Sequence, residues 1–276
     1  MRAIAEGLAG ELGRTIVVEN RGGAGGLTAA SHVGRSPADD GSLLLYGNQG
    51  QVLIARHLLP GNDTDPQALL VPVALTVRTQ FLLVVPADSP FKSVADVAAA
   101  ARARPLQFGV PGIGTPPHLA TLLLGEATGS KPQVVPYQGS APALVDLIAG
   151  RLDASFDNVA SSLEHVRAGR LRALGISSRT RSPAVPEVPP IADGGVEGYA
   201  FQAWQGLFAP KATTERTLQA LEDATLRSLR SHTVRQRLEG LGLEVAAQGR
   251  AEFQALIAQE SRFWEAMVRK GLFKTG

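Results

Sequence analysis

The 276-residue sequence contains no cysteine, which excludes disulfides, thiolate metal sites and cysteine nucleophiles. It also has no apolar run of about 18 residues, the length needed to span a bilayer, so we expect no direct membrane insertion. Neither charge dominates: 27 Lys and Arg face 25 Asp and Glu, and the basic residues are scattered among the acidic ones. This pattern predicts no nucleic-acid partner.

Residues suited to metal binding or catalysis are sparse. The five histidines are widely separated, and none has the i, i+4 partner of a zinc-binding helix. No Gly-x-Ser-x-Gly elbow is present, and spacing assembles no Ser/His/Asp set. The glycine-rich stretch Gly23–Gly26 lacks the third glycine of a dinucleotide fingerprint, because Thr28 stands there, and it favours a helix-entry turn. We therefore expect no metal, no cofactor and no enzymatic activity.

Helix and strand patterns alternate along two parts of the chain, which predicts two α/β domains. The first part suggests a parallel sheet, and the second has short connections between its elements. Two long helical patterns, at 215–241 and 251–270, are expected to return and cover the first domain. The other expected helices are 1–12, 27–35, 94–104, 116–128, 142–149 and 159–168, and the expected strands are 15–18, 42–46, 81–85, 106–110, 133–136, 154–157, 172–177, 203–209 and 243–246.

The stretch Leu106–Leu124 combines a strand, a loop of small residues and a helix start. Pro116 and Pro117 fit the first helical turn, and Thr115 is positioned to cap it. A helix N-terminus can receive a carboxylate or phosphate without a cationic side chain. A capped core helix is the alternative interpretation.

Several polar residues stand at predicted strand ends, where ligands of open α/β sheets bind: Asn48, Gln49, Thr115, Gln138, Ser140 and Asp157. Cationic side chains are few among them, which favours recognition through neutral donors and backbone. Asp157 could equally cap the following helix. His118 either faces the ligand or is a packed or solvated helix residue, and Trp204 either walls the cleft or packs in the core.

Six segments, in order along essentially the whole chain, resemble the extracytoplasmic solute receptors of tripartite tricarboxylate transporters, the Bug family. They are Val17–Gly26 (VVENRGGAGG), Val135–Ala143 (VPYQGSAPA), Asp146–Asp153 (DLIAGRLD), Phe156–Asn158 (FDN), Gly169–Gly175 (GRLRALG) and Trp204–Pro210 (WQGLFAP). The resemblance implies a type II periplasmic-binding-protein fold whose two domains, 1–85 plus 206–276 and 86–205, close on a small ligand. It also implies a periplasmic location and delivery of a carboxylated or amide-bearing solute to the membrane subunits of a transporter.

Carried over from the family, the cleft loops correspond to Asn48 and Gln49, Gly114 and Thr115, Gln138, Gly139, Ser140 and Ala141, and Asp157. Family members begin with a signal peptide and a first strand before the helix that Met1 opens here. The sequence as given is therefore expected to lack that strand of domain 1. A ligand-sensing module of the same fold, signalling to a regulatory partner, is the alternative function.

Overall fold

The computed structural model describes residues 1–58 and 64–271. The chain divides into two compact units: unit 1 contains residues 1–78 and 203–276, and unit 2 contains residues 79–202. The chain thus leaves unit 1 once and returns to it once. The domain boundaries expected from the sequence, after residues 85 and 205, lie a few residues beyond these crossings and stay a prediction.

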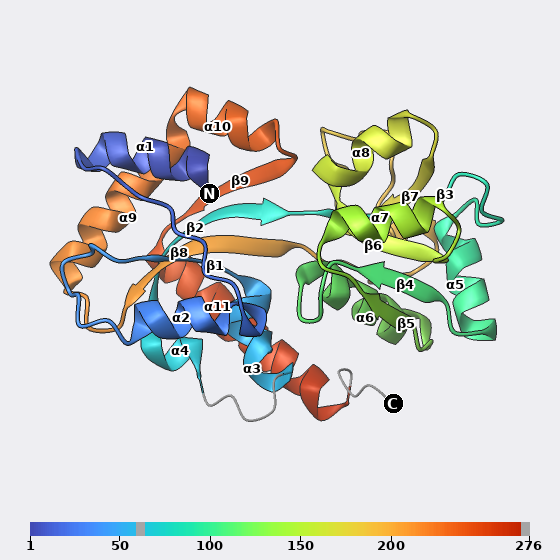
Figure 1. Cartoon of the computed structure of the whole chain (residues 1–276), viewed down its shortest axis with the longest axis horizontal. Coiled ribbons are helices and arrows are strands. Elements are labelled where there is room, and N and C mark those ends of the chain that lie inside the picture. Colours follow the sequence, from blue (N-terminus) through green and yellow to red (C-terminus); the bar gives the residue numbers. More distant parts are fainter. Residues whose placement is uncertain (59–63, 272–276) are drawn as a thin grey trace. The chain divides into compact units, whose positions relative to one another are not determined.

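Unit 1 is built on a four-stranded sheet with the order β1-β8-β2-β9 (Figure 1). Its strands are β1 (Leu45–Asn48), β2 (Leu70–Thr79), β8 (Ala203–Pro210) and β9 (Leu243–Gln248). β1 and β8 are antiparallel, with Leu45 opposite Phe208, so the parallel sheet expected here is wrong for this pair. Local alternation of helix and strand cannot reveal the direction of a strand such as β8, which returns from the other unit.

The helices of unit 1 come from both ends of the chain. They are α1 (Arg2–Leu12), α2 (Leu27–Gly34), α3 (Ala55–Leu58), α4 (Pro66–Leu69), α9 (Glu215–Arg230), α10 (His232–Glu239) and α11 (Arg250–Arg269), with a 3₁₀ turn η1 (Ala24–Gly26) and a π-helical turn η2 (Gly50–Ile54). α1 lies beside α9 and buries Ile4 and Leu8 (Figure 1). The single helix expected over 215–241 is two helices, because Ser231 leaves the helical conformation with a ψ of 129°.

Residues Thr15–Val18 form no strand, and the buried strand expected there is wrong. Val17 is 84% exposed, while the neighbouring Ile16 packs partly against the core beside Leu8. A strand is stable when its backbone groups pair with a neighbour. None of the strands in the described ranges pairs with this segment, and an apolar run alone does not supply a partner.

Unit 2 contains a five-stranded sheet with the order β5-β4-β6-β3-β7. Its strands are β3 (Phe81–Pro86), β4 (Gln107–Val110), β5 (Gln133–Pro136), β6 (Ala154–Asn158) and β7 (Leu171–Ile176), and its helices are α5 (Val94–Ala103), α6 (Pro116–Thr128), α7 (Ser140–Ile148), α8 (Val159–Arg167) and the 3₁₀ turn η3 (Ala192–Gly194). β4 runs parallel to β5 and β6, whereas β3 runs antiparallel to β6 and β7. The alternation expected in this part of the chain is confirmed.

The core of unit 2 is aromatic as well as aliphatic. Phe108 on β4 stacks on Phe156 of β6 with ring centroids 6.4 Å apart, and Phe156 stacks on Tyr199 at 6.0 Å. Leu82, Leu144 and other aliphatic side chains form a second cluster with α7, on the other face of the sheet, because Phe156 lies opposite Leu83 and Leu82 lies opposite Asp157. The core therefore holds β4 and β6, and the loops that follow them, in a defined position.

Candidate functional site

The carboxyl ends of β4, β5 and β6 lie at the same edge of the unit 2 sheet, because these three strands are parallel neighbours. A helix follows each strand: α6 begins at Pro116, α7 at Ser140 and α8 at Val159 (Figure 1). First-turn N–H groups have no partner within their own helix, and the positive end of the helix dipole lies there. The edge therefore gathers three helix N-termini, an arrangement suited to an anionic group.

The loop before α6 is held by its own side chains. The backbone N–H of Gly114 donates to Nδ1 of His118 at 3.0 Å, and the hydroxyl of Thr115 donates to the carbonyl of Gly112 at 2.7 Å. Thr115 occupies the N-cap position but its side chain caps no helix N–H, so that part of the expectation is wrong. Because Pro117 at the second helical position has no N–H, one of the two donors that a cap side chain would serve is missing.

His118 is a buried residue of the first turn of α6, with 6% of its surface exposed. Burial lowers the pKa of its imidazole to about 4. The ring is therefore neutral near pH 7, and since Nδ1 accepts the Gly114 hydrogen bond, the proton sits on Nε2. His118 positions the loop before α6, and direct contact of its side chain with a ligand stays a prediction.

The loop before α7 contains Gln138 and Gly139, and α7 begins at Ser140, two residues before the expected start. Gly139 has φ 119° and ψ 174°, a conformation that is essentially confined to glycine. The first-turn amides of Ser140 and Ala141 are not used by any hydrogen bond within residues 1–58 and 64–271. Neither this loop nor Pro111–Thr115 contains Lys or Arg, so backbone amides are the donors available there.

Asp157 lies near the end of β6 and is 1% exposed. Its Oδ2 accepts hydrogen bonds from the hydroxyls of Ser161 and Ser162, the latter at 2.9 Å. Both serines belong to the first turns of α8, so the carboxylate holds the strand-to-helix junction in place. The structure thus supplies a local role for Asp157, and a contact with a ligand stays a prediction.

In unit 1, Asn48 and Gln49 follow one another at the end of β1. Oδ1 of Asn48 accepts from the backbone N–H of Gln51 at 3.0 Å. Nε2 of Gln49 donates to Oε2 of Glu260 at 2.6 Å, and Nε1 of Trp204 donates to the same oxygen at 2.7 Å. Trp204 is fully buried, so it belongs to the core of unit 1.

Glu260 is a residue that the sequence did not single out. It lies in the middle of α11, 211 positions from Gln49, and no local motif marks it. Burial raises the pKa of its carboxyl group, and the hydrogen bonds from Trp204 and Gln49 act in the opposite direction. A half-buried acid within a long amphipathic helix resembles any other polar-face residue until its partners are known.

The predicted site residues thus form two groups. Gly114, Thr115, His118, Gln138, Gly139, Ser140, Ala141 and Asp157 gather at the strand ends of unit 2, and Asn48, Gln49 and Trp204 belong to unit 1. Over residues 1–58 and 64–271, no three His, Asp or Glu side chains lie close enough to hold a metal ion. Within the same ranges, no helix combines the length and the apolar character needed to cross a membrane.

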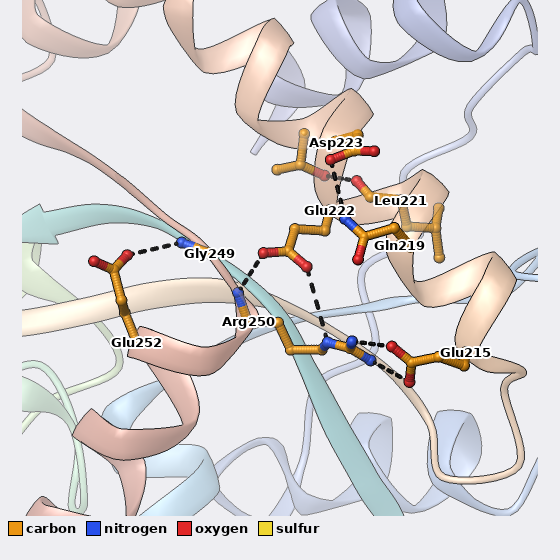
Figure 2. Close-up of polar contacts among 9 residues, drawn as sticks. Glu215, Gln219, Leu221, Glu222, Asp223, Gly249, Arg250 and Glu252 are labelled. Atoms are coloured by element: carbon orange, nitrogen blue, oxygen red, sulfur yellow. Dashed lines mark hydrogen bonds and ion pairs between the residues drawn. The ribbon is translucent and has the colours of Figure 1, made fainter.

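A surface groove of about 630 Å³ lies elsewhere in unit 1, with Leu70, Phe208 and Arg250 among its lining residues. Figure 2 shows that Arg250 is committed to two acids of α9: Nη1 donates to Glu215 at 2.8 Å, and its backbone N–H donates to Glu222 at 2.8 Å. This network fastens the start of α11 to α9. It therefore has a structural role, and the guanidinium is not free to serve an anion in the groove.

Comparison with known proteins identifies the family of the chain. A family described as "Tripartite tricarboxylate transporter family receptor" matches residues 1–272. The chain belongs to this receptor family. Its members are solute-binding receptors rather than enzymes, and the Bug resemblance drawn from the sequence is confirmed.

Three solved structures illustrate how far the receptor fold is shared. Rpa4515 of R. palustris, determined with adipate, has a TM-score of 0.87 and 33% identity, covering 97% of this chain and 90% of that one. MatC (Rpa3494) from Rhodopseudomonas palustris, with bound malate, has a TM-score of 0.84 and 31% identity, covering 99% and 92%. The periplasmic binding protein BugD has a TM-score of 0.84 and 28% identity, covering 98% and 92%. The expected receptor fold is confirmed.

Proposed function

We propose that this receptor captures a small carboxylate, with the solute's carboxylate group bound at the strand-end edge of unit 2. The observation that carries the proposal is the meeting of three helix N-termini at the ends of β4, β5 and β6, beside loops without Lys or Arg. Backbone amides and helix dipoles there offer a positive potential that is fixed before the ligand arrives. Amide-bearing solutes can use the same donors.

The carboxylate class is supported by the relatives, of which one was determined with adipate and another with malate. We further propose that the receptor acts in the periplasm and passes its solute to the membrane subunits of a tripartite transporter. The family description and the periplasmic relative BugD support this assignment. Asn48 and Gln49 stay predicted ligand-binding residues.

Removing one backbone donor tests the proposal. Ser140→Pro deletes the first N–H of α7 while keeping a residue suited to the first helical position. A hydrogen bond to a charged group contributes about 1.5–3 kcal/mol, so affinity should fall by roughly 10- to 100-fold. Isothermal titration of ligand-stripped protein with succinate, malate, adipate and citrate measures this change.

The matched control is His232→Pro, at the first position of α10 in unit 1, where the side chain is exposed. It makes the same chemical change away from the proposed site, so affinity should not change. Unaltered binding by Ser140→Pro would place the carboxylate elsewhere. Wild-type protein that binds none of the four acids would refute the carboxylate assignment.

A further inference from the structure

The side-chain amide of Gln49 is used on one side only. Its Nε2 donates to Glu260 at 2.6 Å, whereas its Oε1 is buried and, within the described part of the chain, has no hydrogen-bond partner. The whole residue is 2% exposed. An unpaired buried acceptor destabilises a protein by about 1–3 kcal/mol, so such atoms are uncommon in native structures.

The orientation of this amide is determined by Glu260. Trp204 has a donor-only indole N–H, which lies 2.7 Å from the same carboxylate oxygen that Gln49 contacts. Trp204 is in turn fixed by the edge-on ring of Phe253, 5.0 Å away. Glu260 is thereby held as an acceptor, and a flipped Gln49 would bring two oxygens together. The NH₂ group of Gln49 must face Glu260, which turns Oε1 away.

Neighbouring groups do not satisfy this oxygen. The side chain of Asn48 is occupied with the backbone of Gln51, and Gln51 itself donates from Nε2 to the carbonyl of Gly26 at 2.7 Å. Gln49 follows directly on the last residue of β1, at the carboxyl end of that strand. Carboxyl ends of strands are where α/β proteins place ligands, so a ligand can supply the missing donor.

We propose that Gln49 is a specificity-determining residue, which accepts a hydrogen bond from a hydroxyl, amide or ammonium group of the solute, and that Glu260 is its positioning residue. The inference rests on the proposed function, because it names the chemical class of carboxylate that the receptor selects. It predicts a preference for hydroxy or amino carboxylic acids over plain dicarboxylates. A second carboxylate at this point would meet an acceptor oxygen and the acidic group behind it.

Two pairs of probes isolate the donor: malate against succinate, and 2-aminoadipate against adipate. Each pair shares a carbon chain and differs by one hydroxyl or ammonium group. Wild-type protein should bind the donor-bearing member of at least one pair about tenfold more tightly, the equivalent of one net hydrogen bond of about 1.4 kcal/mol. Gln49→Met, which has a similar length but no amide, should reduce that ratio to about one by weakening the donor-bearing acid.

Glu260→Leu tests the positioning role, since it leaves Gln49 in place but lets its amide turn. The selectivity ratio should fall by a smaller factor than in Gln49→Met. The matched control is Gln67→Met. Gln67 also contacts α11: its side-chain oxygen accepts a hydrogen bond at 2.8 Å from the hydroxyl of Ser261, which follows Glu260 in the chain. This control should lose a similar packing interaction and keep the wild-type ratio, which separates selectivity from a general loss of stability.

The outcomes are distinguishable. An unchanged ratio for both pairs between wild type and Gln49→Met overturns the inference and leaves the proposed function standing. A wild-type preference for succinate and adipate over their donor-bearing partners also overturns it. If wild-type protein binds neither these four acids nor citrate, the proposed function fails and the inference fails with it.

Discussion

Nδ1 of His118 lies 3.0 Å from the backbone nitrogen of Gly114 and accepts its hydrogen bond, which ties the loop after β4 to the first turn of α6. An imidazole can accept at Nδ1 only when that nitrogen is unprotonated. The geometry therefore requires the neutral form, and burial of the ring enforces it by lowering its pKa to about 4. Loop conformation and protonation state are linked through this one bond.

The link predicts how stability depends on pH. Between pH 6.5 and about 4 the unfolded chain protonates His118 while the folded protein does not, so stability falls as pH decreases across this window. A pKa difference of this size corresponds to a loss of at most about 3 kcal/mol in the free energy of unfolding. The loss grows as pH falls and is complete below about pH 4. His118→Gln keeps an acceptor oxygen but does not titrate, so it should flatten this part of the curve.

Urea denaturation at half-unit steps from pH 4 to pH 7 measures the effect. His32→Gln is the control, because His32 is exposed on α2 and holds no loop in place. It should retain the wild-type slope. Parallel slopes for wild type and His118→Gln would show that the imidazole is not the group responsible.

Glu260 should produce the opposite dependence. Because burial raises its pKa, the folded protein holds this proton at a pH where the unfolded chain has already released it. The free energy of unfolding therefore falls as pH rises through the raised pKa, because the buried carboxyl group becomes charged. At lower pH the group is neutral and does not destabilise the protein. Glu260→Gln keeps the shape and an acceptor oxygen. Thermal denaturation should show it at least as stable as wild type at pH 8, with the advantage shrinking towards pH 5.

A reversed result, in which Glu260→Gln loses more stability as pH rises, would mean that the charged carboxylate is net stabilising. The two donors from Trp204 and Gln49 would then outweigh desolvation. Glu265→Gln on the same helix, with an exposed side chain, is the control for a general change of charge.

The sequence predicted best those features that neighbouring residues determine. Ser93 caps α5 through a reciprocal pair with Asp96, a pattern readable within four residues. The strand-loop-helix units of unit 2 were predicted for the same reason, and with them the strand ends where the candidate site lies. Alternating apolar and polar runs with short connections specify such units without any knowledge of distant residues.

Apart from the missing Thr115 cap and the break at Ser231, which have local causes, the errors and omissions involve partners far apart in the chain. Thr15–Val18 has a strand-like composition but no pairing neighbour in the described structure, so the strand predicted from this composition does not form. The direction of β8 beside β1 and the bond from Gln49 to Glu260 connect segments more than 150 residues apart. Side-chain patterns record which face of an element is buried, but not which element covers it.

The two interpretations of Asp157 make different predictions. Asp157→Ala removes the acceptor for the hydroxyls of Ser161 and Ser162, although both also donate to the carbonyl of Asn158. If the carboxylate serves mainly to hold the start of α8, stability should fall by about 2 kcal/mol, as for a lost hydrogen bond to a charged group. Urea denaturation measures that loss, and titration of the same variant with malate measures affinity. A loss of affinity without a loss of stability would instead assign Asp157 to solute contact.

A pair of glycines separates loop geometry from helix stability. Gly139 precedes α7 with φ 119°, and Gly129 ends α6 with φ 68°, and a Cβ added at either would meet no atom within 4 Å. Both alanine substitutions therefore act through backbone strain alone. Gly129→Ala, in the left-handed helical region, should destabilise by about 1 kcal/mol and leave malate affinity unchanged.

Gly139→Ala enters a region that is essentially closed to other residues, so we expect a loss of about 1–3 kcal/mol. Strain of this size is relieved by rotating the peptide before Ser140, which turns the amides of Ser140 and Ala141 away from a bound carboxylate. Malate affinity should then fall at least tenfold, because two donors to a charged group are affected together. Denaturation and titration on both variants provide the comparison. Equal affinity in Gly139→Ala and Gly129→Ala would show that the loop before α7 does not hold the solute.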